Sequence, residues 1–148
     1  METESRKKYS AKHLFLLTVS GAVVFWIASF ITSLLPIAAE YRAAYGNWSM
    51  QTVWVGAVFA GLLFGFLVSF ILLKGGKSAP VRHPLLRAVL LSLCALAAAT
   101  LLIDLPHARQ AHENMLHYFW IGVMFNTIRF VLLGTAIGLT HRVFRVNQ

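Results

Sequence analysis

The residue with the clearest chemical potential is Arg129, which lies inside an apolar run that extends from Tyr118 to Thr140. Counted from an outer boundary near Phe119 at about 1.5 Å per helical residue, it lies about 15 Å deep, near the midplane of a hydrocarbon core of about 30 Å. A charged side chain at that depth is costly and therefore faces the interior of a helix bundle. Because its planar fork of N–H donors suits phosphate or carboxylate, Arg129 is the main candidate for ligand binding.

Polar side chains of the neighbouring runs could surround this guanidinium. Helical side chains lean toward the N-terminus of their own helix, so Arg129 is expected to point toward the outer half of the membrane. Pro36 lacks the amide that would bond the carbonyl of Thr32, which leaves an acceptor near that level. We expect an outward-opening polar pocket that contains, besides Arg129, the residues Asn126, Ser29, Thr32, Ser33 and Thr100, with Asp104 at its rim.

Two interpretations of Arg129 remain open at this stage. In the first, the guanidinium bonds hydroxyl and carbonyl groups and holds the helices in register without binding a ligand. In the second, it binds an anion or a lipid headgroup that approaches from outside. No carboxylate is expected at its depth to decide between them; the acidic residues are Glu2, Glu4, Glu40, Asp104 and Glu113.

His112, Glu113 and His117 are weak candidates for a metal site on the outer side. A helix brings two ligands together at spacings of three or four residues, and only Glu113 and His117 meet this condition. A bundle haem requires histidines within the membrane on facing helices, and the apolar runs contain none in that position. We therefore expect neither a metal nor another cofactor.

Four apolar runs must position these residues: 14–35, 52–73, 85–105 and 118–140. Each is long enough to cross a bilayer as a helix and lacks the polar alternation of a barrel strand. Backbone amides in lipid must bond within their own segment, which again favours helices. The predicted fold is all-α: a polytopic membrane protein whose four transmembrane helices form an antiparallel bundle, in a single domain over residues 1–148.

The basic residues predict how this bundle is oriented. Only Arg42 and Arg109 fall on the side of the first and third connections, so the positive-inside rule places both termini in the cytoplasm, in an inner or plasma membrane. Because the basic residues are spread over short loops and form no stripe, nucleic acid is not an expected partner. The ten basic residues of the cytoplasmic side are Arg6, Lys7, Lys8, Lys12, Lys74, Lys77, Arg82, Arg87, Arg142 and Arg145.

The outer connections carry two further predictions. Tyr41, Tyr45 and Trp48 follow one another at spacings of four and three residues, which would place them on one face of a short interfacial helix. Asp104 is expected to act as the N-cap of a helical segment over residues 107–117.

Small residues recur at every fourth position of the second run. Such a stripe lets two helix backbones approach closely in a membrane. The partner is either another helix of the same chain or a second protomer, and the pattern does not distinguish them. The stripe consists of Ala57, Gly61, Gly65 and Ser69, and a shorter version in the fourth run consists of Gly134 and Gly138.

The chain is therefore predicted to be a small, non-enzymatic four-span membrane protein. It would act as a helix-packing or assembly subunit or as a homo-oligomer, with membrane lipids as partners. The alternative is a transporter, channel or lipid-binding protein with an outward-opening anion site at Arg129. The spans hold no nucleophile paired with a base and no neighbouring carboxylates, so an active site within the membrane is not expected. A second alternative is therefore an outer-face membrane enzyme that uses His112, Glu113 and His117.

Overall fold

The computed structural model describes residues 2–44, 48–74, 83–108 and 114–146, and every regular element within these ranges is helical. The elements are α1 (Glu2–Ser33), α2 (Pro36–Ala44), α3 (Met50–Lys74), α4 (Pro84–Ala99), the π-helix η1 (Thr100–Asp104), α5 (Leu105–Ala108) and α6 (Met115–Val146).

Four segments of these helices are long and apolar enough to cross a membrane, which confirms the predicted all-helical chain with four candidate spans. Large apolar side chains such as Phe59 and Leu102 are 69% and 75% exposed. A surface of this kind is unfavourable in water and favourable in lipid, where helices satisfy their own backbone groups. The four segments are Ala11–Ser33, Met50–Lys74, Pro84–Asp104 and Met115–Phe144.

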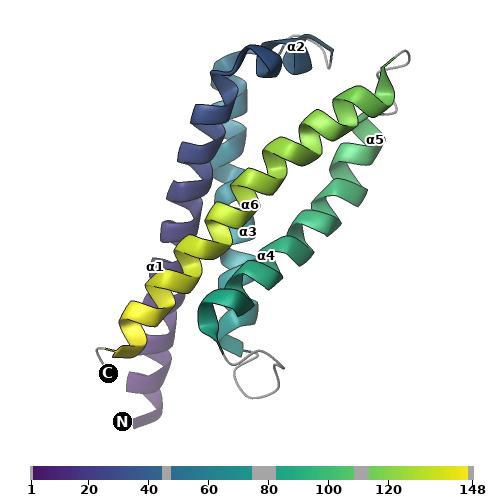
Figure 1. The fold of residues 1–148 in the computed structure, drawn as a ribbon. Helices are drawn as coiled ribbons and strands as arrows, with labels where there is room; N and C mark the ends of the chain where they lie inside the picture. The colour runs from purple at the N-terminus through teal and green to yellow at the C-terminus, as the bar shows by residue number, and fades with distance from the viewer. Residues whose placement is uncertain (1, 45–47, 75–82, 109–113, 147–148) are drawn as a thin grey trace.

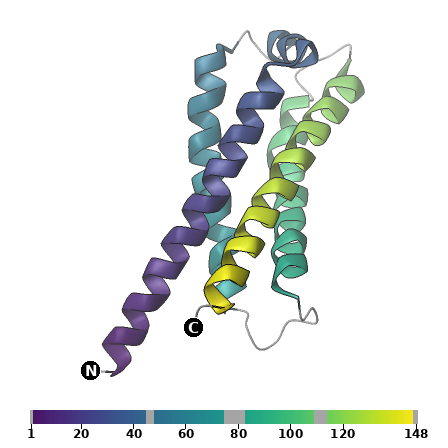
Figure 2. The same ribbon diagram turned by 60° about the vertical axis from the view of Figure 1, so that its left-hand side comes forward.

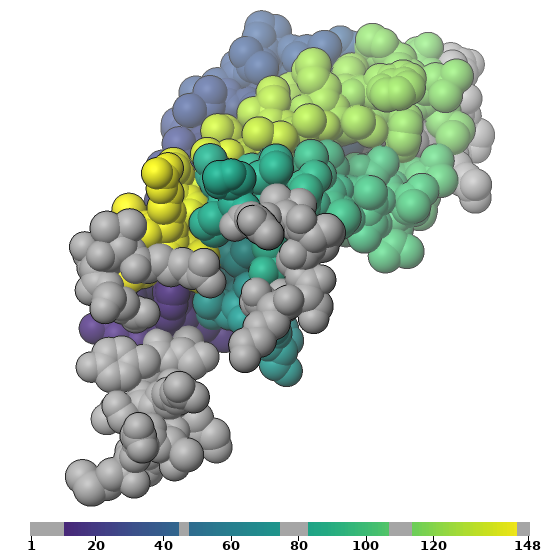
Figure 3. Space-filling model, turned by 60° about the horizontal axis from the view of Figure 1, so that its bottom comes forward, coloured from purple at the N-terminus to yellow at the C-terminus, as the bar shows by residue number. Residues whose placement is uncertain are grey.

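The four long helices pack as two pairs, α1 with α3 and α4 with α6, and α6 also packs against α1. Figure 1 shows the α4–α6 pair leaning away from the α1–α3 pair toward the end that carries α2 and α5. Figure 2 shows α2 lying across that end and both termini at the other end. Figure 3 shows the face on which α4 and α6 lie against each other. The two pairs therefore approach each other near the termini and separate near α2.

The small-residue stripe of α3 faces α1. A Cβ atom added at Gly65 would lie 2.9 Å from the carbonyl oxygen of Thr18, and one added at Gly61 would lie 3.0 Å from that of Ala22. The stripe is thus covered by a helix of the same chain, so it provides no reason to infer a second protomer. The other two members of the stripe are also buried: Ala57 and Ser69.

The two glycines of α6 make the same kind of contact with α4. A Cβ atom added at Gly134 would lie 2.9 Å from the Cα of Val89, and one added at Gly138 would lie 2.7 Å from the Cα of Leu85. Close approach of this kind maximises dispersion contacts between helices that gain little from the hydrophobic effect in lipid. Glycines therefore join the helices within each pair.

Pro36 ends α1 and begins α2. Without an N–H it cannot bond the Thr32 carbonyl, and the chain tightens so that the N–H of Leu35 donates to that carbonyl at 3.3 Å. The prediction that this carbonyl is left free is wrong. The carbonyl that becomes available is that of Ser33, which accepts a hydrogen bond from Nη1 of Arg42 at 3.0 Å.

A short helix follows this turn, as predicted, but it ends at Ala44. Tyr41 belongs to it, whereas Trp48 comes after its end and Tyr45 lies outside the described residues. The predicted row of three aromatic side chains on one helix face is therefore wrong at Trp48, because the backbone at Trp48 is not helical.

At the same end of the molecule, α4 continues without a break through η1 into α5. The N–H of Leu105 donates to the carbonyl of Thr100, five residues earlier, which defines a π-helical turn. The prediction that Asp104 is an N-cap is wrong, because the backbone around it is continuously helical. Of the predicted segment 107–117, part falls in α5 and part in α6, and residues 109–113 lie outside the described residues.

Gly65→Ala is expected to lower the thermal stability of the protein, because the new methyl group would meet the backbone of α1, which cannot rotate away as a side chain can. Overpacking of this kind costs about 1–3 kcal/mol. Gly56→Ala in the same helix is the control, since a Cβ atom there meets nothing within 4 Å. Thermal unfolding of both variants in one detergent measures the difference, and equal midpoints would contradict the close contact of α3 with α1.

Candidate ligand-binding pocket

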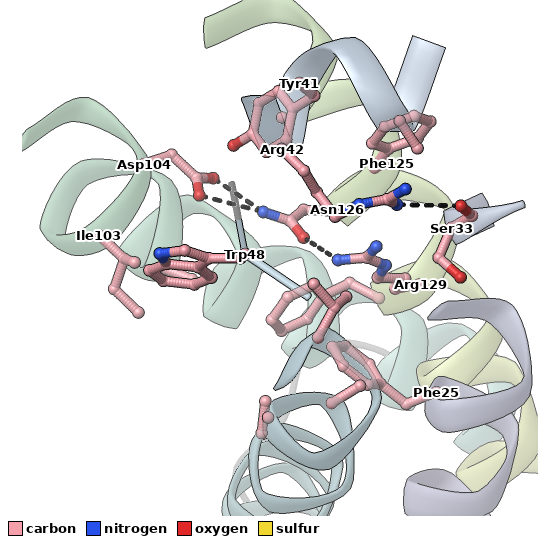
Figure 4. Close-up of a pocket in the computed structure, with 18 of the residues that line it drawn as sticks. Phe25, Ser33, Tyr41, Arg42, Trp48, Ile103, Asp104, Phe125, Asn126 and Arg129 are labelled. Atoms are coloured by element: carbon pink, nitrogen blue, oxygen red, sulfur yellow. Dashed lines mark hydrogen bonds between the residues drawn. The ribbon is translucent and has the colours of Figure 1, made fainter. Parts of the chain in front are cut away.

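A pocket of about 410 Å³ lies where the two helix pairs separate. Residues of α1, α2, α3, α4, η1 and α6 line it, together with Trp48 before α3, and Figure 4 shows the labelled side chains converging. A mostly apolar wall with a few convergent polar groups is typical of ligand-binding pockets. Its charged members are Arg42, Asp104 and Arg129, and its aromatic members are Phe25, Tyr41, Trp48, Phe64, Phe125 and Phe130.

Arg129 joins α6 to α1 across this pocket. Its Nη2 donates a hydrogen bond to the hydroxyl oxygen of Thr32 at 3.2 Å, and its Nη1 donates to the side-chain oxygen of Asn126 at 3.2 Å. The guanidinium therefore reaches the level of Thr32, close to the end of α1, as the lean of helical side chains predicts. Both partners are residues that the sequence placed around Arg129.

Asn126 connects this guanidinium to a carboxylate. Its Nδ2 donates to Oδ1 of Asp104 at 3.1 Å and to Oδ2 at 2.9 Å, while its Oδ1 accepts the bond from Arg129. No carboxylate was expected at the depth of Arg129, and Asp104 was expected at the rim of its pocket; the structure links Asp104 to Arg129 through this one amide. The π-helical turn, which ends at Asp104, carries that carboxylate to hydrogen-bonding distance of α6.

Arg42 supplies a second guanidinium that sequence reasoning did not assign to the pocket. It comes from α2 and is anchored to the carbonyl of Ser33, at the C-terminal end of α1, where a cation is favourable. The hydroxyl of Ser33 accepts a separate bond from the indole Nε1 of Trp54 at 2.9 Å. Arg42 reaches this position because the chain changes direction at Pro36, between α1 and α2. The spacing of residues in the sequence does not indicate this change of direction.

Both guanidinium groups have more N–H donors than the hydrogen bonds described above use. A guanidinium has five N–H groups, and the bonds to Thr32 and Asn126 use two of those on Arg129. Its Nε is buried and has no hydrogen-bond partner among the described residues. A buried donor without a partner costs about 1–3 kcal/mol, so Arg129 stands to gain from an additional acceptor.

The pocket changes from polar to apolar along its length. Arg42, Asp104 and the guanidinium of Arg129 lie near the end that carries α2 (Figure 4). The wall farther along α3 contains Ala60 and Phe64. The lining residues of α3 run from position 52 to position 64, about 18 Å at 1.5 Å per residue. The pocket thus has one charged end and a long apolar extension.

Three of the residues expected in the pocket do not line it: Ser29, Thr100 and Thr32, although Thr32 bonds the guanidinium of Arg129. Ser29 is fully buried and donates to the carbonyl of Phe25 at 2.8 Å, within its own helix. Thr100 begins the π-helical turn and is not part of the wall. Helical serines and threonines commonly satisfy themselves by bonding a carbonyl one turn earlier, so their depth alone did not show which of them face the pocket.

The weak metal candidates receive no support from the described residues. His117 Nε2 lies 3.6 Å from Oε1 of Glu40, and both side chains are 56% exposed. His112 and Glu113 lie outside the described residues. Within the described ranges, no three histidine, cysteine, aspartate or glutamate side chains are grouped closely enough to hold a metal ion.

Comparison of the chain with known protein families, with curated proteins and with solved structures finds no match. The four long apolar helices are consistent with a small membrane protein, and its role must be argued from the pocket itself.

Asn126→Ala is expected to destabilise the protein by about 1–3 kcal/mol, because it leaves both Arg129 and Asp104 without the partner that joins them. Thr127→Ala is the matched control, since that hydroxyl donates to the carbonyl of Val123 in its own helix, at 2.7 Å. Thermal unfolding in detergent compares the two variants. Equal stability would show that the amide bridge contributes nothing to the fold.

Proposed function

We propose that this chain is a four-span integral membrane protein that binds the anionic headgroup of an amphiphilic molecule, such as a membrane lipid, in the pocket at Arg129. In this proposal the spans form an antiparallel bundle in an inner or plasma membrane, both termini are cytoplasmic and the pocket opens toward the outside. Binding requires neither a cofactor nor a chemical reaction.

The observation that carries the proposal is the polarity gradient of the pocket. Its charged end, at Arg42 and Arg129, suits a phosphate or carboxylate, and its apolar extension toward Phe64 suits a hydrocarbon chain. The whole α3 wall of the pocket, charged end included, extends about 18 Å, which is comparable to one leaflet, about 15 Å of a 30 Å hydrocarbon core. An amphiphile that is oriented like a membrane lipid would match both parts at once.

The donors left over on the two guanidinium groups support the same conclusion. Hydrogen bonds between an arginine and an anionic oxygen are about twice as strong as those between neutral groups, and their strength increases where water is excluded. The Nε of Arg129 is buried without a partner among the described residues, so an anionic oxygen at this end would complete its hydrogen bonding.

The charge distribution supports the orientation. The basic residues concentrate in the N-terminal part of α1, around the α3–α4 connection and in the C-terminal part of α6, at the end of the molecule opposite α2. Under the positive-inside rule those ends are cytoplasmic, which leaves the charged end of the pocket on the outer side.

A second candidate function is purely structural, with Arg129 as a clamp between helices. The bonds from its guanidinium to Thr32 of α1 and to Asn126 of α6 favour this role, and they would exist without any ligand. A helix-packing subunit of a larger assembly would need nothing more. The two candidates differ in what happens when lipid is added.

Gly56→Leu is expected to block lipid binding and to leave the lipid-free protein as stable as before. Gly56 lines the pocket, and a Cβ atom there meets nothing within 4 Å, so the larger side chain would occupy the space meant for the ligand. Val55→Leu is the control, because Val55 is 56% exposed and lies outside the pocket wall.

The measurement is the thermal stability of purified protein in detergent, with phosphatidylethanolamine or phosphatidylglycerol added. At a lipid concentration 100-fold above Kd, binding stabilises the folded state by about 2.7 kcal/mol. Wild type and Val55→Leu should show this gain with at least one lipid, and Gly56→Leu should not. Equal stabilisation of all three proteins would place lipid elsewhere and overturn the proposal.

Arg129→Lys separates binding from clamping. Lysine keeps the positive charge but loses the planar fork, so we expect a small loss of stability without lipid and a loss of most of the lipid-induced stabilisation. Thermal unfolding with and without lipid gives both quantities. If the variant is less stable but retains the full lipid effect, Arg129 is a clamp and the binding role is rejected.

A further inference from the structure

The charged end of the pocket is not uniformly basic, because Asp104 faces the same space as the two arginines. We infer that the preferred headgroup carries a primary ammonium group as well as a phosphate, as phosphoethanolamine does. The phosphate is bound by Arg129 and Arg42, and the ammonium group is bound by Asp104. This inference rests on the proposed function and names the chemistry of its ligand.

Asn126 holds the two kinds of charge apart. Its amide oxygen faces Arg129 and its amide nitrogen faces Asp104, an orientation fixed by three hydrogen bonds. The side chain cannot turn over without breaking all of them. One wall of the charged end is therefore cationic and the opposite wall is anionic, with one amide group between them.

Asp104 retains acceptors for an ammonium group. An ionised carboxylate has about four lone-pair sites, and the two bonds from Nδ2 of Asn126 occupy two of them. The side chain lies at the pocket wall and is half-buried, so its free acceptors are accessible from the pocket. An ammonium group has three donors and would pair with those acceptors.

Two aromatic rings further favour the binding of a cation at the wall that contains Asp104. Figure 4 shows Tyr41 and Trp48 around Asp104, and both line the pocket. The faces of tyrosine and tryptophan rings attract cations, with tryptophan the better of the two. A carboxylate bordered by such rings suits an organic ammonium group better than it suits a glycerol hydroxyl.

Repulsion disfavours the purely anionic alternative. A phosphate bound between Arg129 and Arg42 lies in the same pocket as the Asp104 carboxylate, at a site where apolar walls strengthen interactions between charges. A headgroup that brings its own cation offsets this repulsion, whereas a headgroup with hydroxyls alone does not. Asp104 is thus expected to act as a specificity-determining residue.

The test compares phosphatidylethanolamine with phosphatidylglycerol of identical acyl chains, titrated into the full-length protein in detergent, with Kd measured from the thermal shift. Wild type is expected to bind the ethanolamine lipid about tenfold more tightly than the glycerol lipid. A tenfold ratio of Kd values corresponds to about 1.4 kcal/mol, which one charge-assisted hydrogen bond can supply. Asp104→Asn, which can still accept a bond from Asn126, should lose the preference. Glu40→Gln removes the same charge from a residue of α2 that does not line the pocket, and it should keep the preference.

Comparison of the lipids on the wild-type protein alone decides the matter even if Asp104→Asn does not fold. Equal affinities, or tighter binding of phosphatidylglycerol, would overturn the ammonium preference and leave the proposed function standing. Absence of binding to either lipid would overturn both. A preference that persists in folded Asp104→Asn would also reject the assignment to Asp104.

A final arm identifies the source of the headgroup. Soluble O-phosphoethanolamine carries the same two charges without acyl chains. If it stabilises wild type but not Asp104→Asn, the site accepts the soluble molecule; if only the lipid does so, the apolar extension is required. Both results support recognition of the ammonium and phosphate pair, and failure of both ligands rejects it.

Discussion

A guanidinium inside an apolar helix bundle must find hydrogen-bond partners on the helices around it, and this requirement organises the half of the molecule that carries α2. Arg129 of α6 meets it by bonding Thr32 of α1 and Asn126 of its own helix. Asn126 in turn reaches Asp104 at the end of η1. One buried cation thus links three segments that are distant in the chain, and it does so where the helices are no longer held together by close backbone contact.

The pocket arises from two kinds of packing in one bundle. Glycines hold α3 against α1 and α6 against α4, so each pair is close. Between the pairs lie large rings: the centroid of Phe130 is 5.6 Å from that of Phe25 and 4.8 Å from that of Phe64, both in edge-to-face contact. Small residues within pairs and phenylalanines between pairs make the pairs diverge above this cluster. The three rings form the apolar part of the pocket wall, and the polar network closes the space only in part.

The parts of this arrangement that the sequence predicts are those set by local properties. Span length and apolar composition are local, so four helical spans follow from them; the three-residue spacing of Asn126 and Arg129 and the lean of helical side chains predict their contact. The rotation of one helix against another is not local, and Ser29 was therefore placed in the pocket wrongly. Neither the π-helical turn that carries Asp104 nor the reversal that brings in Arg42 has a sequence signal, because both depend on how neighbouring segments pack.

A site intended only to hold helices together would be most stable with every buried donor satisfied, since a partly satisfied polar network is less favourable than a complete one. The network at Arg129 is incomplete among the described residues: its Nε is buried without a partner, and the space beside it is a pocket and not a packed core. Proteins retain such unfavourable local arrangements mainly where function needs them. The same hydrogen bonds that fix the guanidinium also prevent it from turning to complete its own bonding. An acceptor on a bound ligand would complete this bonding, which is why we favour the proposed binding role over a clamp.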